Sequence, residues 1–184
     1  MSARQWAALV AIALGTAALV HAATLAYVPR LVMNSVMAKM GAPNTMHHAP
    51  RATAASHGVV RPSPDLLYSS CPFDLSAGPL HVHAPVPPGT YWSVSAYDDT
   101  TNNFFALNDR QAGAGAVDLL IVSQGESRPA AAGGMRIAAS PSKTGVVLLR
   151  TLINDEKRFA AIDRARRQAT CETISGSGAS KSGG

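Results

Sequence analysis

Three residues in the middle of the chain, Asp65, Tyr68 and Asp74, have side chains that can exchange protons with a substrate. Two carboxylates beside a phenol suit general acid/base catalysis when a fold brings them together. The alternative is structural, because an aspartate after Pro64 or at the end of a strand is typical of a turn, and a tyrosine among apolar residues is typical of a core. We favour the structural interpretation and keep all three as catalytic candidates.

Arg150 is the fourth catalytic candidate, because it interrupts an apolar run from residue 146 to residue 152. Burying an unpaired guanidinium is costly, so the sequence predicts an acidic partner for it. The candidate partners are Asp65, Asp74 and Asp98. We expect Arg150 to form a structural ion pair. The functional alternative is that Arg150 binds an anionic or carboxylate ligand.

Two histidines, His81 and His83, lie two residues apart in a stretch expected to form a strand, which places both imidazoles on one face. They are weak candidates for metal ligands, since the sequence identifies no third ligand, and the more ordinary expectation is that both face solvent. A second group, His47, His48 and His57, has no cysteine or carboxylate nearby. We therefore predict no metal site.

The chain has two cysteines, Cys71 and Cys171, at opposite ends of the segment that carries the other candidates. In an oxidising compartment a disulfide between them would close a long loop and stabilise the domain by about 3 to 5 kcal/mol. Two free thiols are the alternative. We favour the disulfide, which would tie the C-terminal helix to the first strand of the domain.

Composition limits the classes of function. Among 184 residues, 16 Lys and Arg against 11 Asp and Glu give a formal net charge of +5, but the basic residues are scattered. A nucleic-acid-binding protein gathers such residues on one face, so we expect no nucleic-acid partner. The chain also lacks the short motifs of phosphate-binding loops, dinucleotide-binding folds, serine hydrolases and zinc proteases, and we expect no cofactor.

The strongest physical signal lies at the N-terminus. Residues 6–28 contain no Asp, Glu, Lys or Arg, and at about 1.5 Å per residue a helix of this length crosses the roughly 30 Å hydrocarbon core of a bilayer. A signal peptide would be cleaved before Ala23, but the apolar stretch continues past it, and Tyr27 and Arg30 suit a membrane interface. We favour an uncleaved signal anchor, with His21 as a neutral residue in the span.

Five segments follow from these patterns. They are an n-region (1–5), a transmembrane helix or signal anchor (6–28), a short helix and linker (29–58), a β-sandwich domain (59–171) and a disordered tail (172–184). Pro29 is expected to kink the helix, so that residues 31–40 lie along the membrane or against the domain. The Gly/Ser-rich composition of the tail is typical of disorder.

Short apolar runs bounded by turn residues predict six strands in the domain. They are residues 66–70, 80–84, 91–97, 104–107, 117–122 and 145–152. No helix-length crossover lies between them, which favours antiparallel pairing. A helix capped by Asn154 is expected to follow the last strand. The predicted fold class is an all-β sandwich or jelly-roll-like domain with one N-terminal transmembrane helix and a C-terminal helix.

Several blocks of this domain resemble one protein family. They are SPDLLYSSCPFDL at 63–75, GP at 78–79, TYWSV at 90–94, TNNFF at 101–105 and GVVLLRTL at 145–152. Together they resemble the domain-of-unknown-function 1254 family over roughly residues 59–171. The resemblance implies a β-rich sandwich of undefined activity, often paired with a second β domain. We expect this chain to be similar to the small membrane-anchored members, which would work beside a separate partner protein.

Two functional hypotheses remain. The first is a single-pass protein of the inner (cytoplasmic) membrane whose periplasmic domain is a binding or accessory module, with the lipid bilayer and a companion β-domain protein as partners. The positive charges flanking the span are balanced, so this orientation rests on the signal-like n-region. The second is a hydrolase-type enzyme with Asp65, Tyr68, Asp74 and Arg150 in one cleft. Geometry separates the two, because an enzyme needs these side chains to converge on a common pocket.

Overall fold

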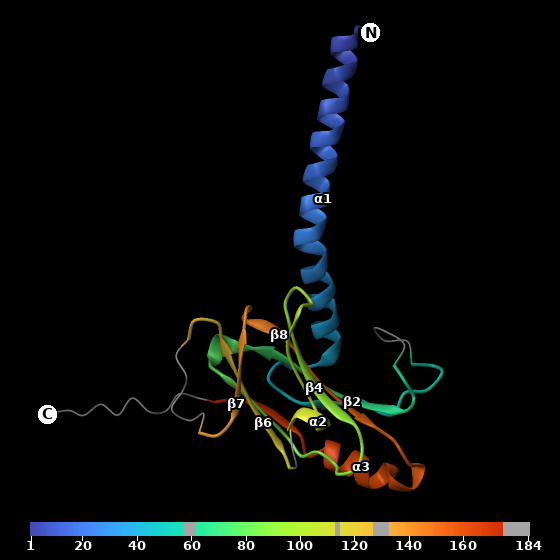
Figure 1. Ribbon diagram of the computed structural model, residues 1–184, viewed down its shortest axis with the longest axis vertical. Coiled ribbons are helices and arrows are strands. Elements are labelled where there is room, and N and C mark those ends of the chain that lie inside the picture. Colours follow the sequence, from blue (N-terminus) through green and yellow to red (C-terminus); the bar gives the residue numbers. More distant parts are fainter. Residues whose placement is uncertain (57–61, 113–114, 127–132, 175–184) are drawn as a thin grey trace, which may run out of the picture.

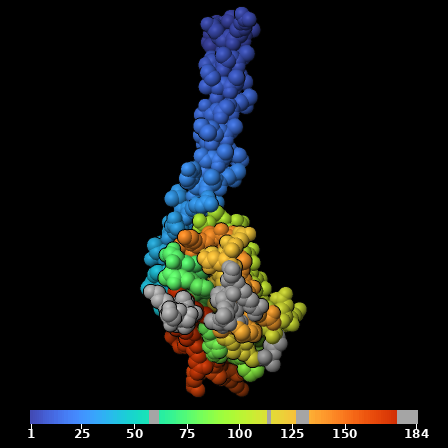
Figure 2. All heavy atoms as spheres, turned by 90° about the vertical axis from the view of Figure 1, so that its left-hand side faces the viewer, coloured from blue at the N-terminus to red at the C-terminus, as the bar shows by residue number. Residues whose placement is uncertain are grey.

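The computed structural model describes residues 1–56, 62–112, 115–126 and 133–174. A long N-terminal helix stands on a domain of two β-sheets, and the other described helices are short (Figure 1). Figure 2 shows this helix projecting from one end of the domain. The packed core of the chain therefore lies in the domain.

The long helix, α1 (Ala3–Met40), has 38 residues and is about 57 Å long at 1.5 Å per residue. Its first turn is fixed by a capping box, in which Ser2 and Gln5 exchange hydrogen bonds between side chain and backbone. The most apolar part of α1 is fully exposed, and it is long and apolar enough to cross a bilayer. Met33, near the other end, is buried against the domain.

The helix continues through Pro29, so residues 29–40 belong to α1 and do not form the separate short helix that was predicted. An internal proline removes one backbone hydrogen bond and crowds the preceding turn, at a cost of about 3 kcal/mol. The turns that follow pack on the domain through Met33, and Arg30 forms an ion pair of 3.5 Å with Asp99 of the domain. These contacts offset the cost and hold the last turns of α1 against the domain, which is one of the two placements that the sequence predicted.

The domain consists of two sheets, which we call sheet A and sheet B. Sheet A contains, in order, β1 (His47–His48), β2 (Leu66–Asp74), β8 (Thr144–Leu152), β4 (Trp92–Asp98) and β5 (Asn103–Asn108). Sheet B contains β7 (Arg136–Ser140), β6 (Val117–Ser123), β3 (Leu80–Ala84) and β9 (Thr170–Thr173). Short helices connect the strands: η1 (Leu75–Ala77), α2 (Asp109–Ala112), η3 (Glu156–Arg158) and α3 (Phe159–Arg166).

The core lies between the sheets, because each contributes one apolar face. Along β3, Leu80, Val82 and Ala84 are buried, whereas the two histidines between them are half-exposed. Val94 and Ala96 of β4 belong to the same buried cluster. This alternation is what a strand with one buried face requires. The two-layer arrangement agrees with the sandwich predicted from the sequence.

Gly145 lies where β8 passes between β2 and β4. A Cβ atom at this position would lie 2.1 Å from the carbonyl oxygen of Tyr97 and 2.6 Å from the ring of Phe73. The absence of a side chain lets Phe73 pack against the backbone of β8, where its ring also meets the edge of the Phe104 ring. The glycine is therefore needed for space in the centre of sheet A.

All six predicted strands are present, and β1, β7 and β9 are additional. Each additional strand is short and rich in polar residues or alanine, so it gives a weak apolar signal. The pairings among the six predicted strands are antiparallel, as expected, whereas the additional strand β7 pairs with β6 in parallel. About a dozen residues separate the two strands, which is the length that a parallel connection needs.

The predicted C-terminal helix is present, but it does not begin at Asn154. Asp155 caps η3 by accepting a hydrogen bond of 2.9 Å from the backbone N–H of Lys157, and α3 follows. Asn154 instead donates a hydrogen bond of 2.7 Å to the carbonyl oxygen of Gly89. Cys171 lies on β9 and not on the helix that it was expected to tie.

Residues 41–56, most of the predicted linker, are packed on the domain. Gly41 has a φ of +107°, and a Cβ atom there would lie 2.5 Å from the ring of His47. β1 extends sheet A, and Arg51 forms a two-pronged ion pair with Glu156. This segment therefore belongs to the domain. His57, the predicted domain start at residue 59 and the part of the predicted tail beyond residue 174 lie outside the described residues. The predicted start of the tail at residue 172 is wrong, because Glu172 and Thr173 belong to β9.

Candidate functional site

The two aspartates among the catalytic candidates lie at opposite ends of β2. Asp65 is exposed just before the strand, where its backbone N–H donates to the hydroxyl of Ser63. Asp74 ends the strand and caps η1, and hydrogen bonds from Ser76, one of them 2.8 Å long, hold the pKa of its carboxyl below the usual value. A strand of nine residues places its ends about 25 to 30 Å apart. Both aspartates therefore have turn positions, and no substrate atom can touch both.

Tyr68 and Arg150 are direct neighbours in the register of β2 and β8. The Tyr68 hydroxyl accepts a hydrogen bond of 3.0 Å from the backbone N–H of Ser63, and its ring is half-buried. Arg150 donates from Nε to the hydroxyl of Ser93 at 3.2 Å and from Nη2 to that of Ser95 at 3.5 Å. Both candidates therefore lie on the outer face of sheet A.

Within the described residues, none of the ion pairs includes Arg150, so the prediction of an acidic partner is wrong. Arg150 points outward and stays half-exposed, so water and two serine hydroxyls solvate its guanidinium. Asp98, one of the expected partners, is buried and accepts hydrogen bonds from Thr100 and Asn102. The four catalytic candidates thus do not form the cleft that a hydrolase would need.

His81 and His83 lie on the outer face of sheet B and share one carboxylate. The distance to Oδ1 of Asp118 is 3.1 Å from Nε2 of His81 and 2.8 Å from Nδ1 of His83. The hydrogen bond from His83, with a smaller contribution from His81, lowers the pKa of Asp118. Sequence reasoning missed Asp118, because only the pairing of β3 with β6 places it opposite His83.

The two histidines face solvent from the outer face of sheet B, as the sequence predicted, and they are also half-buried and hydrogen-bonded. Within the described residues, no group of three or more His, Cys, Asp or Glu side chains is arranged to hold a metal ion. The arrangement of the two imidazoles and Asp118 is that of a hydrogen-bonded surface cluster.

A second polar network lies under α3. The Arg166 side chain is fully buried, pairs with Asp163 and donates to the hydroxyl of Ser69 at 3.2 Å and to the carbonyl oxygen of Tyr68. Nδ1 of His48 lies 2.8 Å from the same serine hydroxyl. The i, i+3 spacing of Asp163 and Arg166 was visible in the sequence, but their contact with β2 was not.

The serine and histidine of this network have the spacing of a nucleophile and its base. Ser69 is only 1% exposed, and Arg166 donates directly to its hydroxyl. A substrate therefore has no access to this oxygen. Burial, and to a smaller degree the charge of Arg166, lowers the pKa of His48 below its usual 6.5. The network is a structural bridge between α3, β1 and β2.

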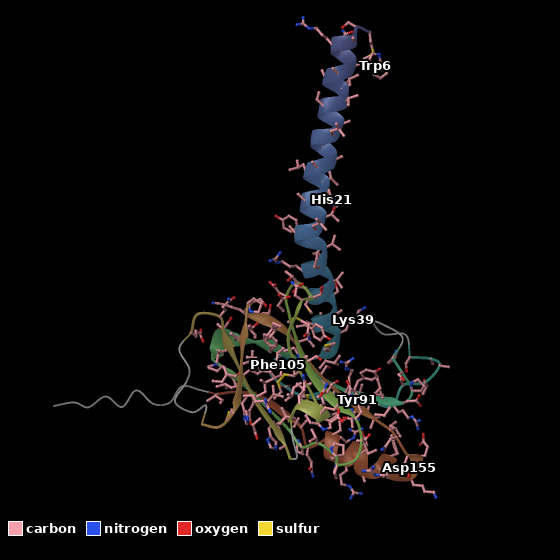
Figure 3. All side chains as sticks on the ribbon, viewed as in Figure 1. Trp6, His21, Lys39, Tyr91, Phe105 and Asp155 are labelled. Carbon is pink, nitrogen blue, oxygen red and sulfur yellow. A yellow bond between two sulfur atoms is a disulfide. The ribbon has the colours of Figure 1, made fainter. Side chains whose placement is uncertain are left out.

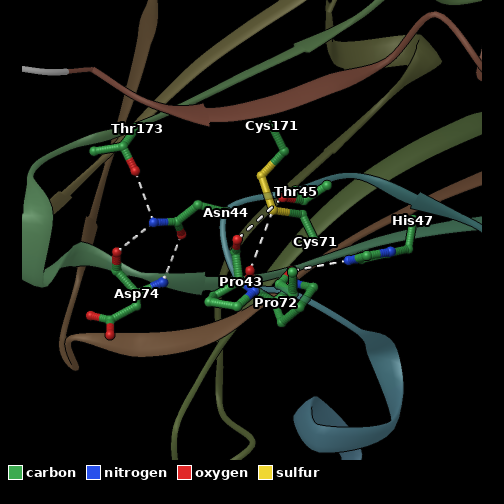
Figure 4. Close-up of a disulfide and its surroundings, with 10 residues drawn as sticks. Pro43, Asn44, Thr45, His47, Cys71, Pro72, Asp74, Cys171 and Thr173 are labelled. Atoms are coloured by element: carbon green, nitrogen blue, oxygen red, sulfur yellow. Dashed lines mark hydrogen bonds between the residues drawn. A yellow bond between two sulfur atoms is a disulfide. The ribbon is translucent and has the colours of Figure 1, made fainter.

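The entry of α1 into the domain is fixed by Asn44, as Figure 4 shows. Its Nδ2 donates 2.8 Å hydrogen bonds to the carbonyl oxygen of Asp74 and to the hydroxyl of Thr173, and its Oδ1 accepts one of 2.8 Å from the backbone N–H of Asp74. Asp74 belongs to sheet A and Thr173 to sheet B. One side chain therefore links the end of the helix to both sheets.

A disulfide lies beside Asn44 (Figure 4). It joins Cys71 of β2 to Cys171 of β9, with a Cα–Cα distance of 6.4 Å and a sequence separation of 100. Both cysteines are buried in the cluster between the sheets. The bond is therefore a covalent link between sheet A and sheet B.

A cavity of about 570 Å³ opens beside α2 and the loop between β3 and β4. Figure 3 shows Tyr91, which lines it, on the side of the domain toward Asp155 and away from the exposed part of α1. None of the four catalytic candidates and neither histidine of β3 lines this cavity. The residues predicted to do chemistry and the cavity therefore lie in different parts of the domain.

Comparisons with known proteins bear on the fold. Two crystal structures are similar to this chain: the VPA0106 protein of Vibrio parahaemolyticus, at 14% identity and a TM-score of 0.59 over 80% of this chain, and an uncharacterized protein of Burkholderia cenocepacia, at 17% identity and a TM-score of 0.48 over 71%. The chain covers 37% and 34% of those two proteins, about a third of their length. No curated protein matches it.

The model of a family described as "Protein of unknown function (DUF1254)" matches residues 43–173. The match begins ahead of residue 59, in agreement with the packing of residues 41–56 on the domain. It also confirms the resemblance carried by the blocks around Asp65 and Gly145. The chain belongs to the DUF1254 family of proteins of unknown function.

Proposed function

We propose that this chain is a membrane-anchored accessory module. In this proposal α1 crosses the inner membrane once, the domain lies in the periplasm, and the domain binds a companion β-domain protein. The observation that carries the proposal is the contrast along α1, whose apolar part is fully exposed while Met33 is buried on the domain. A helix of exposed Leu, Val and Ile side chains is unfavourable in water and favourable in lipid.

The disulfide supports the orientation. Structural disulfides form and persist in oxidising compartments such as the bacterial periplasm. Cys71 and Cys171 form the disulfide in the core between the sheets, and the described residues contain no free cysteine. A periplasmic domain agrees with this chemistry, whereas a cytoplasmic domain would keep both thiols reduced.

The proposal of a companion protein rests on the outer face of sheet A. This face carries half-exposed polar side chains, among them Tyr68 and Arg150. Such a face suits the polar contacts of a non-obligate interface. The hydrolase hypothesis gains no support, because its two aspartates lie at opposite ends of β2 and its four residues do not share one cleft.

Membrane anchoring and orientation are tested together with a C-terminally tagged chain. After cell fractionation, we expect the full-length chain in the membrane fraction, and we expect protease added to spheroplasts to digest the domain. Non-reducing gels of the undigested chain should show faster migration than reducing gels, because the disulfide keeps the denatured chain compact. A soluble, shortened chain or a protease-protected domain would contradict the proposal.

A matched pair of variants tests whether the span itself is responsible. The double variant Leu14→Arg, Leu19→Arg places two charges in exposed positions of the apolar helix, each costing about 2.5 to 3.5 kcal/mol near the bilayer centre. We expect it to leave the membrane fraction. The control Gln5→Arg adds a charge ahead of the span and should remain in the membrane.

The companion is tested by replacing Ala106 of β5 with a photo-crosslinking amino acid. Ala106 is exposed and pairs with Ser95, so it belongs to the outer face of sheet A. Irradiation of membranes should yield one adduct with a β-domain protein, identified by mass spectrometry. The control position, Thr170, is exposed on sheet B. No adduct at position 106, or the same adduct at both positions, would contradict a companion on this face.

A further inference from the structure

The cavity beside α2 has the size of a small-molecule site. Its volume of about 570 Å³ lies within the range of about 300 to 1,000 Å³ that is usual for such sites. The loop before β4 forms one wall, where Arg158 of η3 donates hydrogen bonds to the carbonyl oxygens of Pro88 and Gly89. Gly89 has a φ of +68°, which favours glycine. The wall is thus held in place before any ligand arrives.

Most of the cavity lining is apolar or already hydrogen-bonded. Val86, Pro87 and Tyr91 supply apolar surface, and Tyr91 is 41% exposed. Thr90 donates a hydrogen bond of 2.6 Å to the carbonyl oxygen of Leu152. These groups make a surface that can hold the hydrocarbon or aromatic body of a ligand.

Asp109, which also lines the cavity, is the exception. Its Oδ1 is buried and has no hydrogen-bond partner within the described residues. The ion pairs of the described residues do not include Asp109, and the nearby Arg136 donates to the carbonyl oxygen of Gln111. Asp109 as a whole is only partly buried, and its carboxylate places a negative charge at the wall of the cavity. A ligand with a positive charge would be attracted to this carboxylate, whereas a neutral ligand of the same size would not.

We propose that this cavity binds a small organic amine. The ammonium group would donate to the carboxylate of Asp109, and the apolar body would lie against Tyr91 and Pro87. A charge-assisted hydrogen bond is about twice as strong as a neutral one, and an aromatic ring adds attraction for a cation. The proposal goes beyond the accessory function and depends neither on the anchor nor on the companion protein.

The test uses the full chain in lipid nanodiscs, with 2-phenylethylamine as the probe and 2-phenylethanol as its neutral counterpart of nearly equal size. Trp92 lines the cavity, and Trp6 is the other tryptophan of the chain. In a Trp6→Phe background, the fluorescence of Trp92 therefore reports on the cavity. We expect saturable binding of the amine about tenfold tighter than that of the alcohol, from the strength of a hydrogen bond to a charged group.

Asp109→Asn should remove the preference for the amine, and Tyr91→Ala should weaken both probes. Glu126→Gln neutralises an exposed carboxylate outside the cavity and should leave both affinities unchanged. Thermal unfolding of each variant checks the fold, and Asp109→Ser replaces Asp109→Asn if the latter does not fold. No saturable amine binding, equal affinity for the two probes, or an unchanged preference in Asp109→Asn would overturn the proposal, whatever the anchoring experiments give.

Discussion

At the scale of single residues, Asn44 has the most connections of the side chains around the entry of α1. It combines three side-chain hydrogen bonds with a φ of +53°, a left-handed conformation that asparagine tolerates better than most residues. Because its partners belong to different sheets, its loss leaves polar groups unpaired at the junction of both. Stability at this point therefore depends on one amide group.

We predict that Asn44→Ala lowers the free energy of unfolding by about 2 to 4 kcal/mol, since each hydrogen bond contributes about 1 kcal/mol and alanine resists a positive φ. Asn44→Gly should cost less than Asn44→Ala, because glycine removes the hydrogen bonds but keeps the backbone conformation. Urea denaturation measures both. The exposed neighbour Thr45→Ala is the control and should cost less than about 0.5 kcal/mol.

The protonation of His48 should make the stability of the fold depend on pH. Its pKa is lowered in the folded state, so the unfolded chain binds a proton more readily than the folded one. Stability therefore rises with pH through the window below 6.5 and is lost as the pH falls through it. Denaturant titrations at pH 7.5 and pH 5.5 should give a lower stability at pH 5.5, and His48→Gln should reduce the difference. An equal pH difference in His48→Gln and in the control His47→Gln would contradict this role.

Some of these residue roles could be predicted from the sequence. The turn roles of Asp65 and Asp74 follow from their neighbours, because such hydrogen bonds are local. The hydrogen-bond partners of Arg150 could not be predicted from the sequence. Its two serine partners lie more than fifty residues away in the chain and come next to it only because their strands pair. Asp118 was missed for the same reason.

At the scale of elements, β8 is the central strand of sheet A, with β2 on one side and β4 on the other. The backbone of Tyr97 and the ring of Phe73 leave no room for a side chain at position 145, so β8 fits between its neighbours only because this residue is a glycine. A central strand cannot shift to relieve a clash, because both of its edges are hydrogen-bonded. Position 145 therefore tolerates no residue larger than glycine.

We predict that Gly145→Ala destabilises the domain by about 3 kcal/mol or prevents its folding, because overpacking against backbone cannot relax. The matched control is Gly133→Ala, where an added Cβ meets nothing within 4 Å. Thermal unfolding followed by circular dichroism compares the two. Equal melting temperatures for both variants would show that β8 can move away from β4.

The sequence predicted the elements with the clearest pattern. The six apolar strands were found because alternation and turn residues are local signals. The parallel pairing of β6 with β7 was not predicted, because the relative direction of two strands depends on the path of the chain that connects them. The continuation of α1 through residues 29–40 was not predicted, because local sequence patterns do not contain the packing of Met33 on the domain.

At the scale of the whole molecule, α1 is both the exposed apolar helix and part of the domain's surface. Met33 and the Arg30–Asp99 ion pair hold its last turns against the domain. The ion pair is exposed and contributes little, about 0 to 1 kcal/mol. Apolar packing must therefore fix the angle between helix and domain.

We predict that Met33→Asp detaches the last turns of α1 without unfolding the domain. Hydrogen exchange should become faster for the backbone amides of residues 31–40, while the amides of β4 and β8 keep their protection. Arg30→Ala is the control and should leave both regions nearly unchanged. Loss of protection throughout the domain in Met33→Asp would mean that α1 is part of the cooperative folding unit.

The sandwich and the apolar helix could both be predicted, because hydrophobic pattern and length determine them. The cavity and its lining could not, since Pro87, Asp109 and Asn154 come together from three separate connections. Sites made by loops depend on the complete fold.

The disulfide also sets an order of events during biosynthesis. Cys71 and Cys171 are separated by 100 residues, which at roughly 5 to 20 residues per second corresponds to about 5 to 20 s of translation. Throughout this interval the first thiol has no partner in its own chain, and sheet B lacks β9. An oxidising enzyme can therefore complete the bond only after residue 171 has been added to the chain, and until then the Cys71 thiol is open to intermolecular disulfides, such as a dimer of two nascent chains.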